Sequence, residues 1–549
     1  MKKFTWALLV LIAAGGTLFA AGNSQSSGKA SASQAALQPG DPLGAYPEPV
    51  IVEVGVESNT RIKYPAGDGP DNQQYIRYIK EKLNIDVKIA WAAADYVQRL
   101  NLAIASNNIP DAFRVYPAQL KELADLDLIQ PMDDAIKNYA SPEIKAGYAL
   151  TNGIAESDVT FNGRMMAVPN VAAQADGFDL VWIRKDWIEQ YGLAEPKVLE
   201  DVKSIARAFV RNGKIGIVGP SQNGAIYAAG NNGIRGFDAL FNSYEAYPGY
   251  WLNQNGKAVY GSTTGETRAA LQDLAALYKE GLIDREMGLR KDSAELVISG
   301  QAGIFFGTWW MGYAPLGDAI RNDPKANWQA YFLPSIKTGK YNNTMGPVTN
   351  YYTVVKKGYA HPEAIVKMVN LHRGVESTMD TTVLPISEFP LRTVVTSLDE
   401  CERSFTAIRD YLSGRKTIND FSGDFGIYKG LESDLMTIKD TKLAPYDKMD
   451  IQYWNTDAGA PLNAWRRAYS IMVGVGPVVD TPFTPIYSIT YGQTPTMERR
   501  WANLKKLEDE TFLKIIMGVE PITAFDSFVE QWKREGGTQI LTEVSALIK

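Results

Sequence analysis

Between residues 50 and 115, short apolar runs alternate with segments whose apolar residues recur at helical spacing. The runs are rich in β-branched residues, which is typical of buried strands, and they occupy residues 50–56, 85–89 and 111–115. The intervening segments carry apolar residues on one helical face; they span 75–83, with Asp71 as the expected N-cap, and 96–105. This alternation predicts a parallel sheet with right-handed crossovers, whose ligands lie at the carboxyl ends of the strands.

The same alternation restarts after residue 160. We expect further strands at 165–169, 180–183, 215–218 and 352–355, and helices at 185–191, 271–278 and 362–370. The run 302–306, AGIFF, is apolar on both faces and predicts a central strand. Near the C-terminus an apolar stripe predicts a helix ending at Gly518, and Thr523 begins a capping box whose helix ends at Gly536. A chain of 549 residues is too long for one core and favours two α/β lobes.

The composition excludes several classes of function. The net charge of −6 argues against nucleic acid or an anionic membrane as a partner. With one cysteine, Cys401, and two histidines, the chain has no internal disulfide, and a Cys/His zinc site is not expected. His361 and His372 lie at the two ends of one predicted helix, and neither is expected to be a catalytic base. Aromatic residues make up 11%, which core packing or a ligand with flat apolar faces, such as a sugar, would explain.

The N-terminus predicts export. Two lysines precede an uncharged, mostly apolar run over 4–19, and the small residues Ala20, Ala21 and Gly22 follow. This is the pattern of a secretory signal peptide, residues 1–22, and the run is shorter than the roughly 20 residues that a membrane anchor needs. Residues 23–47 are rich in Ser, Ala, Gln and Gly and are predicted to be a disordered tether.

Motifs for catalysis are missing from the sequence. No Walker loop, dinucleotide-binding glycine turn, GxSxG elbow or EF-hand spacing stands in the required context. Carboxylate pairs occur at 176–179 and 284–286, but a glycosidase pair is defined by its separation in space. A secreted polysaccharide lyase or hydrolase therefore stays an alternative to a binding protein.

Four groups of residues carry a resemblance to a known family. They are 108–113 with 128–132, 162–169 with 180–187, 299–310, and 515–518 with 525–532 and 536–537. In this order they resemble family 1 of the extracellular solute-binding proteins of ABC importers, which includes maltose-binding protein. The likeness is strongest to the branch of the LipO-type and alginate-binding proteins.

The resemblance implies a two-lobed α/β fold that captures its ligand by cleft closure. Each lobe would hold a mostly parallel sheet flanked by helices, with an N-terminal lobe of 48–168 plus 350–480 and a C-terminal lobe of 169–349 plus 481–549. It also implies a periplasmic, non-enzymatic monomer without a cofactor, whose partners are the ligand and the ABC permease subunits. Residues 18–22 lack the lipobox cysteine of many relatives, so no lipid anchor is expected, and 197–214 hold no calcium loop.

The expected ligand is a carbohydrate, with a peptide or another solute as the alternative. By resemblance, Trp309 of GIFFGTWWMG would stack on a sugar ring, while Trp310 packs inward. The remaining candidates follow predicted strands or crossings between lobes, and each could instead belong to the core; they are Tyr116, Asn170, Gln174, Asn350, Tyr351, Trp454 and Tyr487. No metal ligand is predicted.

Overall fold

The computed structural model describes residues 40–548, except 59–61, 222–224, 228–233, 380–382, 423–429, 433, 439–448 and 457–461. The predicted signal peptide and residues 23–39 of the predicted tether lie outside this range. The described residues belong to one compact unit that contains two separate larger sheets. Within the described part of the chain, every helix is too short or too polar to cross a membrane.

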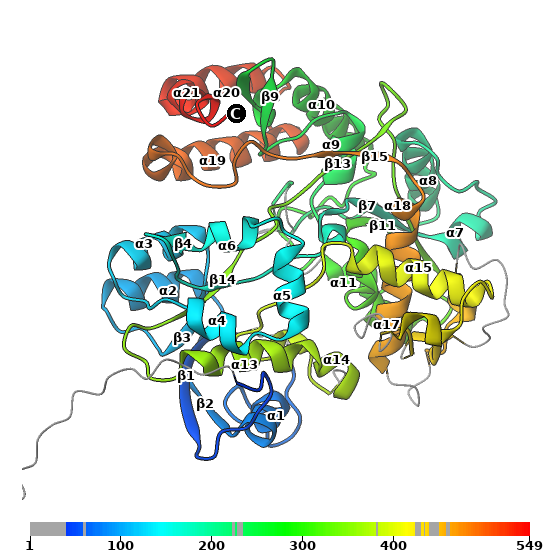
Figure 1. Cartoon of the computed structure of the whole chain (residues 1–549). Coiled ribbons are helices and arrows are strands. Elements are labelled where there is room, and N and C mark those ends of the chain that lie inside the picture. The colour runs from blue at the N-terminus through cyan, green and yellow to red at the C-terminus, as the bar shows by residue number, and fades with distance from the viewer. Residues whose placement is uncertain are drawn as a thin grey trace, which may run out of the picture. The chain divides into compact units, whose positions relative to one another are not determined.

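The first sheet has the strand order β2-β1-β3-β14-β6 (Figure 1). β1 (Val50–Glu57) pairs in parallel with both β2 (Ile85–Ala93) and β3 (Ala112–Val115), as the sequence predicts. β14 (Tyr352–Val355) is antiparallel to β3 and to β6 (Val168–Pro169). The chain leaves the first sheet after β6 and returns to it at β14, so these two strands run in opposite directions. The first sheet is therefore mixed rather than mostly parallel.

The second sheet has the order β12-β7-β11-β8. β11 (Ala302–Gly307) lies between β7 (Leu180–Arg184) and β8 (Ile215–Ile217), and all six of its residues are buried, which confirms the predicted central strand. Only the β11–β8 pair is parallel, because β7 is antiparallel both to β11 and to β12 (Trp328–Tyr331). The expectation of a mostly parallel sheet is wrong here.

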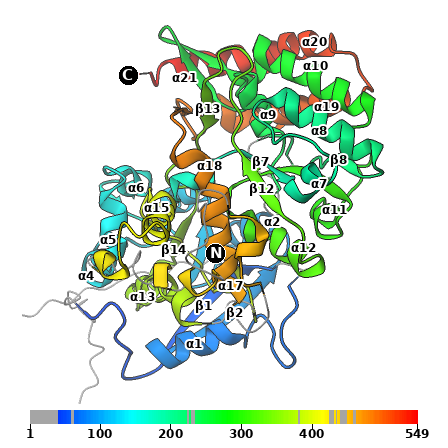
Figure 2. The same cartoon turned by 90° about the vertical axis from the view of Figure 1, so that its right-hand side faces the viewer.

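Alternate residues of β7 and β11 enter two different hydrophobic clusters, so both faces of the second sheet are covered. Val181 and Ile304 join the cluster under α8 (Leu199–Arg211), α10 (Gly265–Glu280) and α19 (Pro495–Ile516). Trp182 and Phe305 join the opposite cluster, under α12 (Leu316–Asn322) and α15 (Glu400–Leu412). Figure 2 shows helices of these groups around β7 and β12.

The chain returns to the second sheet earlier than expected. Phe405, Trp465 and Met472 pack in the same cluster as Trp182, so the described residues between 400 and 479 pack on the second sheet rather than the first. The expected N-terminal lobe segment 350–480 is therefore too long. Its described residues pack on the first sheet only up to about residue 399, and they include α13 (Pro362–Arg373).

The start of the described chain is attached to α13. Lys367 donates to the backbone carbonyls of Asp41 (2.8 Å) and Gly44 (2.6 Å), and the Tyr46 hydroxyl donates to Glu363 (2.8 Å). The predicted tether therefore extends too far, because residues 41–46 are fixed by these hydrogen bonds.

The other elements near the first sheet are α1 (Gln74–Leu83), α2 (Tyr96–Ala105), α3 (Pro117–Asp125), α4 (Asp133–Tyr139), α5 (Pro142–Ala149), α6 (Ile154–Asp158), β4 (Thr160–Phe161), β5 (Arg164–Met165), α14 (Val375–Thr378) and η5 (Ile386–Glu388). The remaining elements are η1 (Gln174–Gly177), α7 (Lys185–Gln190), α9 (Asp238–Ser243), β9 (Trp251–Gln254), β10 (Lys257–Tyr260), η3 (Gly261–Thr263), α11 (Ala294–Ile298), η4 (Trp309–Gly312), β13 (Tyr341–Thr344), η6 (Ile418–Phe421), η7 (Ile451–Tyr453), α17 (Leu462–Tyr469), η8 (Ser470–Val475), α18 (Gly476–Val479), β15 (Phe483–Ile486), α20 (Ala524–Trp532), η9 (Lys533–Gly537) and α21 (Thr538–Ser545).

Two predicted helix caps are wrong in detail. The side chain of Gln73, not Asp71, accepts the first free N–H of α1. Thr523 precedes α20 without a side-chain capping bond, because its backbone is already helical. Gly518 lies directly after the C-cap of α19 with a φ of 71°, as predicted for a residue that ends a helix.

Candidate functional site

Three chain segments connect the two sheets, and hydrogen bonds hold them together. They follow β6, precede β14 and precede α15, and they span residues 170–178, 345–351 and 394–399. Ala172 N–H donates to Val348 (3.1 Å), and Gln174 N–H donates to Leu398 (2.7 Å). We call these the connecting segments.

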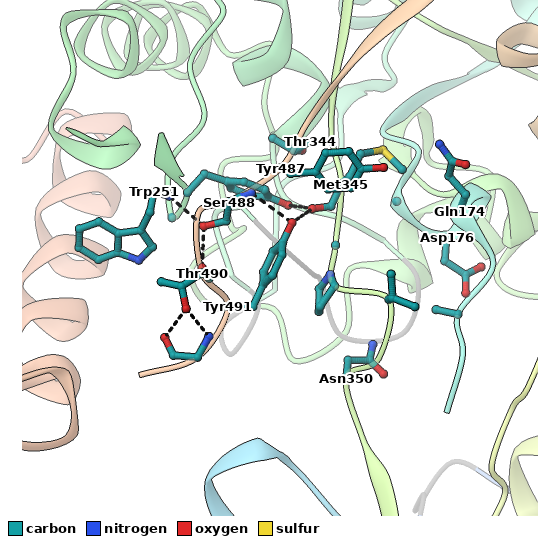
Figure 3. A pocket seen from close by; sticks show the side chains of 18 of the residues that line it. Gln174, Asp176, Trp251, Thr344, Met345, Asn350, Tyr487, Ser488, Thr490 and Tyr491 are labelled. Carbon is teal, nitrogen blue, oxygen red and sulfur yellow. Dashed lines mark hydrogen bonds between the residues drawn. The ribbon is translucent and has the colours of Figure 1, made fainter. Parts of the chain in front are cut away.

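A cavity of about 470 Å³ lies beside the connecting segments (Figure 3). Its volume is within the range of small-molecule sites. Most of its walls come from the connecting segments, the turn before β9 and a C-terminal segment after β15, and Arg235, Thr344 of β13 and the first turns of α19 complete them. The lining side chains include Gln174, Asp176, Arg235, Tyr250, Trp251, Thr344, Met345, Asn350, Tyr487, Ser488, Thr490, Tyr491, Gln493, Met497 and Trp501.

Two tyrosines fix the C-terminal wall of the cavity to the second connecting segment. The hydroxyls of Tyr250 and Tyr491 both donate to the carbonyl oxygen of Met345, at 3.1 and 2.6 Å. Their rings meet edge to face, with centroids 6.3 Å apart. Burial raises the pKa of Tyr491 to about 12, so the hydroxyl stays protonated and keeps donating at neutral pH.

An acidic and a basic side chain lie on the opposite wall. Asp176 accepts from the indole N–H of Trp309 (2.8 Å), and Arg235 donates to the backbone carbonyl of Asp176 (2.6 Å). Burial raises the pKa of the Asp176 carboxyl, while the Trp309 bond and the charge of Arg235 lower it. Arg235 also lies 3.9 Å from Asp179, a fully buried carboxylate that accepts from Asn242 and Thr344. The positive charge of Arg235 is therefore opposed within the protein by the carboxylates of Asp176 and Asp179.

More than half of the chain matches the model of a known family. The family model described as bacterial extracellular solute-binding protein matches residues 62–371, more than half of the chain. The chain belongs to this family.

Curated relatives cover almost the whole chain. The polygalacturonan/rhamnogalacturonan-binding protein YtcQ of Bacillus subtilis is 23% identical over 521 residues, which is 90% of this chain and 93% of YtcQ. Lipoprotein LipO of the same organism is 23% identical over 506 residues, 87% of this chain and 89% of LipO. These relatives confirm the predicted branch of the solute-binding family.

Solved structures of the family share the fold. The alginate-binding protein AlgQ2 without calcium has a TM-score of 0.59 at 15% identity, over 92% of this chain and 99% of AlgQ2. FusA of Streptococcus pneumoniae, in complex with fructo-nystose, has a TM-score of 0.56 at 14% identity, over 90% of this chain and 98% of FusA. The two-lobed fold of the solute-binding proteins is thereby confirmed.

Three of the predicted ligand residues line the cavity. Gln174 is half-buried, Asn350 is exposed, and Tyr487 is 53% exposed. Trp309 lies behind the wall, where it supports Asp176, and Trp310 is half-buried in the same hydrophobic cluster.

Tyr116 and Tyr351 do not line this cavity but lie beside Arg114 at the end of β3. The guanidinium of Arg114 is 5.9 Å from the Tyr116 ring and 5.3 Å from the Tyr351 ring. Tyr351 also directly follows the cavity residue Asn350. These side chains lie at the carboxyl end of β3, the middle strand of the first sheet.

Two predicted ligand residues have structural contacts instead. Trp454 is fully buried, and its indole N–H donates to the Met449 carbonyl (3.2 Å). Its prediction as a ligand residue is therefore wrong, and it belongs to the hydrophobic core. Asn170 is 2% exposed, and its side-chain oxygen accepts from the N–H groups of Asn350 (2.8 Å) and Tyr351 (3.0 Å). Asn170 thus binds two connecting segments together.

The sequence reasoning missed Tyr250, Tyr491 and Arg235. Tyr250 stands in the stretch YPGYW, where a turn dipeptide lies between aromatic residues, and Tyr491 stands in YSITYGQ, which mixes aromatic and small polar residues. Both are patterns from which an aromatic loop could have been predicted. Arg235 has no such signal in the sequence.

Proposed function

We propose that this solute-binding protein captures an oligosaccharide in the cavity beside the connecting segments and delivers it to the permease subunits of an ABC importer. One observation carries the proposal: tyrosine rings and neutral polar side chains meet in one cavity, at the segments that connect the lobes. Sugars need both, because their C–H faces stack on aromatic rings while their hydroxyls take hydrogen bonds. The names of the relatives YtcQ and FusA, which refer to glycans, agree with this proposal.

Capture proceeds by hinge closure at the connecting segments in this proposal. Residues 172–174 and 346–350 both line the cavity and link the lobes, so a ligand that contacts them in the closed state shifts the equilibrium toward closure. The protein works outside the cytoplasm as a monomer, without a lipid anchor and without a cofactor. The solute-binding family consists of binding proteins, which supports the absence of catalysis.

A thermal-shift screen with neutral and acidic oligosaccharides, followed by calorimetric titration, tests the proposal. A ligand at about 100 times its dissociation constant adds about 2.7 kcal/mol to the free energy of unfolding. Tyr487→Ala removes an exposed ring from the cavity and is expected to weaken binding several-fold. Tyr78→Ala, on α1 in the first lobe, serves as the matched control.

Two other results would contradict the proposal. If peptides but no oligosaccharides raise the unfolding temperature, the ligand class is wrong. If the protein releases shorter products from a polysaccharide panel, it is an enzyme, because a binding protein releases none.

A further inference from the structure

We infer that the oligosaccharide is uncharged, and that Glu57 and Asp179 are specificity residues that neutralise arginines which would otherwise attract a sugar acid. This inference rests on the proposed function. It goes beyond the relatives' names, since polygalacturonan and alginate are polymers of sugar acids whereas fructooligosaccharides are neutral. The choice between the two classes comes from the charges around the cavity.

The described lining of the cavity carries two charged side chains, Asp176 and Arg235. Arg235 has two acidic neighbours, because its charge lowers the pKa of the Asp176 carboxyl and its guanidinium lies 3.9 Å from the Asp179 carboxylate. The other polar lining groups are amides and hydroxyls, which pair with neutral sugar hydroxyls as donors and acceptors; they are Gln174, Tyr250, Thr344, Asn350, Tyr487, Ser488, Thr490, Tyr491 and Gln493.

A second arginine, Arg114, lies near the carboxyl end of β3 and also has a carboxylate partner. Arg114 lies among the rings of Tyr96, Tyr116 and Tyr351, at 5.6, 5.9 and 5.3 Å from their centroids. Its guanidinium forms an ion pair with Glu57 at the end of β1. The side chain of Arg114 is 25% exposed and that of Glu57 is 54% exposed, so the pair is partly open to solvent but already neutral. Its link to the cavity is Tyr351, whose ring lies 5.3 Å from the Arg114 guanidinium and which follows the lining residue Asn350.

A third arginine, Arg392, acts on the same carboxylate as Arg235. Its charge lowers the pKa of Asp176, while Glu400 raises that pKa. Arg235 and Arg392 thus oppose the charge of Asp176, Arg235 also lies near Asp179, and Glu57 opposes the charge of Arg114.

A sugar acid would have to compete with these carboxylates. Burying its carboxylate is costly unless a cation is free to pair with it, and here Arg114 and Arg235 would each have to give up an interaction with a carboxylate of the protein. A neutral hydroxyl meets no such cost, because it can donate to Glu57 or accept from Arg114 while their ion pair stays intact. The arrangement therefore favours neutral sugars and selects against their acids.

The test begins with an array of neutral glucans, galactans, arabinans, xylans and fructans, together with oligogalacturonides, alginate oligomers and chitosan oligomers. The strongest ligand is expected to be neutral. Calorimetry then compares that oligosaccharide with the same molecule after oxidation of one primary hydroxyl to a carboxylate. We expect the oxidised form to bind at least tenfold more weakly to the wild-type protein.

Glu57→Gln leaves Arg114 without its carboxylate partner and keeps the size of the side chain. The variant is expected to bind the oxidised ligand at least threefold more tightly than the wild type does, so that the ratio of neutral to oxidised affinity falls. Glu53→Gln removes the same charge from an exposed residue of the same strand and is the control, with no expected change in either affinity.

Each outcome decides the question. If an oligogalacturonide, alginate or chitosan oligomer is the strongest ligand, the inference is overturned while the proposed function stands. If Glu57→Gln and Glu53→Gln alter the two affinities equally, the ion pair has no role in selectivity and that part fails. If no oligosaccharide binds, the proposed function itself fails, and the inference fails with it.

Discussion

Replacing Asn170 separates a structural role from a role in ligand binding. Its side-chain oxygen accepts two backbone N–H groups, those of Asn350 and Tyr351, and its own N–H donates to the Tyr351 carbonyl at 3.2 Å. In Asn170→Ala both donors lose their acceptor. Each unsatisfied buried donor costs about 1–3 kcal/mol, and since Asn350 is exposed, water can satisfy part of the loss. Two such donors would together cost about 2–6 kcal/mol, and because water satisfies part of the loss we expect the free energy of unfolding to fall by about 2–3 kcal/mol.

Urea unfolding followed by tryptophan fluorescence measures this loss, and calorimetry with the identified ligand measures the affinity. Asn170→Asp keeps an acceptor oxygen and should lose less stability than Asn170→Ala. Asn350→Ala removes an exposed side chain but keeps its backbone N–H, so its stability should stay within about 0.5 kcal/mol of the wild type. If Asn170→Ala unfolds like the wild type yet binds ligand more weakly, Asn170 contacts the ligand and the structural assignment is wrong.

Three more predictions address other parts of the molecule. Burial raises the pKa of Glu402 to about 7 from 4.5, so the charged carboxylate destabilises the fold above about pH 7 and has no such effect below about pH 4.5. The free energy of unfolding of Glu402→Gln should therefore exceed that of the wild type by about 1–3 kcal/mol at pH 8 and equal it at pH 4. Equal stability of the two proteins at pH 8 would contradict the burial argument. Trp309→Ala removes the indole N–H that donates to Asp176 in the cavity wall and should weaken ligand binding several-fold in calorimetry, whereas Trp310→Ala should act mainly on the melting temperature; reversed effects would contradict the support of Asp176 by Trp309. Lys367→Met removes the hydrogen bonds to the carbonyls of Asp41 and Gly44 and should make residues 41–46 faster to cleave in limited proteolysis with mass-spectrometric mapping; an unchanged cleavage rate would refute a role of Lys367 in this attachment.

The local elements were predictable because their signals are local. Tyr96–Ala105 forms α2 with the predicted bounds, and the run at 302–306 becomes the buried central strand β11. The directions of the strands were not predictable in the same way. The runs 180–183 and 302–306 are apolar throughout, and an apolar run contains no signal for whether the strand pairs in parallel or antiparallel with its neighbour. Their antiparallel pairing follows from connections more than 100 residues long.

The candidate site was predictable where a ligand residue follows directly from a strand or a crossing. Gln174 and Asn350 belong to segments that must pass between the lobes, so the topology alone places them near any ligand between the lobes. Trp454 shows the limit of this reasoning, since an aromatic residue in a long segment without periodicity fits a core as well as a cavity wall.

The C-terminal wall of the cavity depends on a contact that no local pattern contains. Tyr491 reaches the carbonyl oxygen of Met345, 146 residues earlier in the chain, because β15 pairs with β13 and thereby places residues 487–493 beside the second connecting segment. The same carbonyl accepts from Tyr250, so two distant loops are fixed to one atom of a segment at which we propose that the lobes close. A hinge motion that moves Met345 therefore moves both tyrosines with it. Aromatic residues that line the cavity are in this way coupled to the hinge itself, which is how a ligand held by rings could stabilise the closed state.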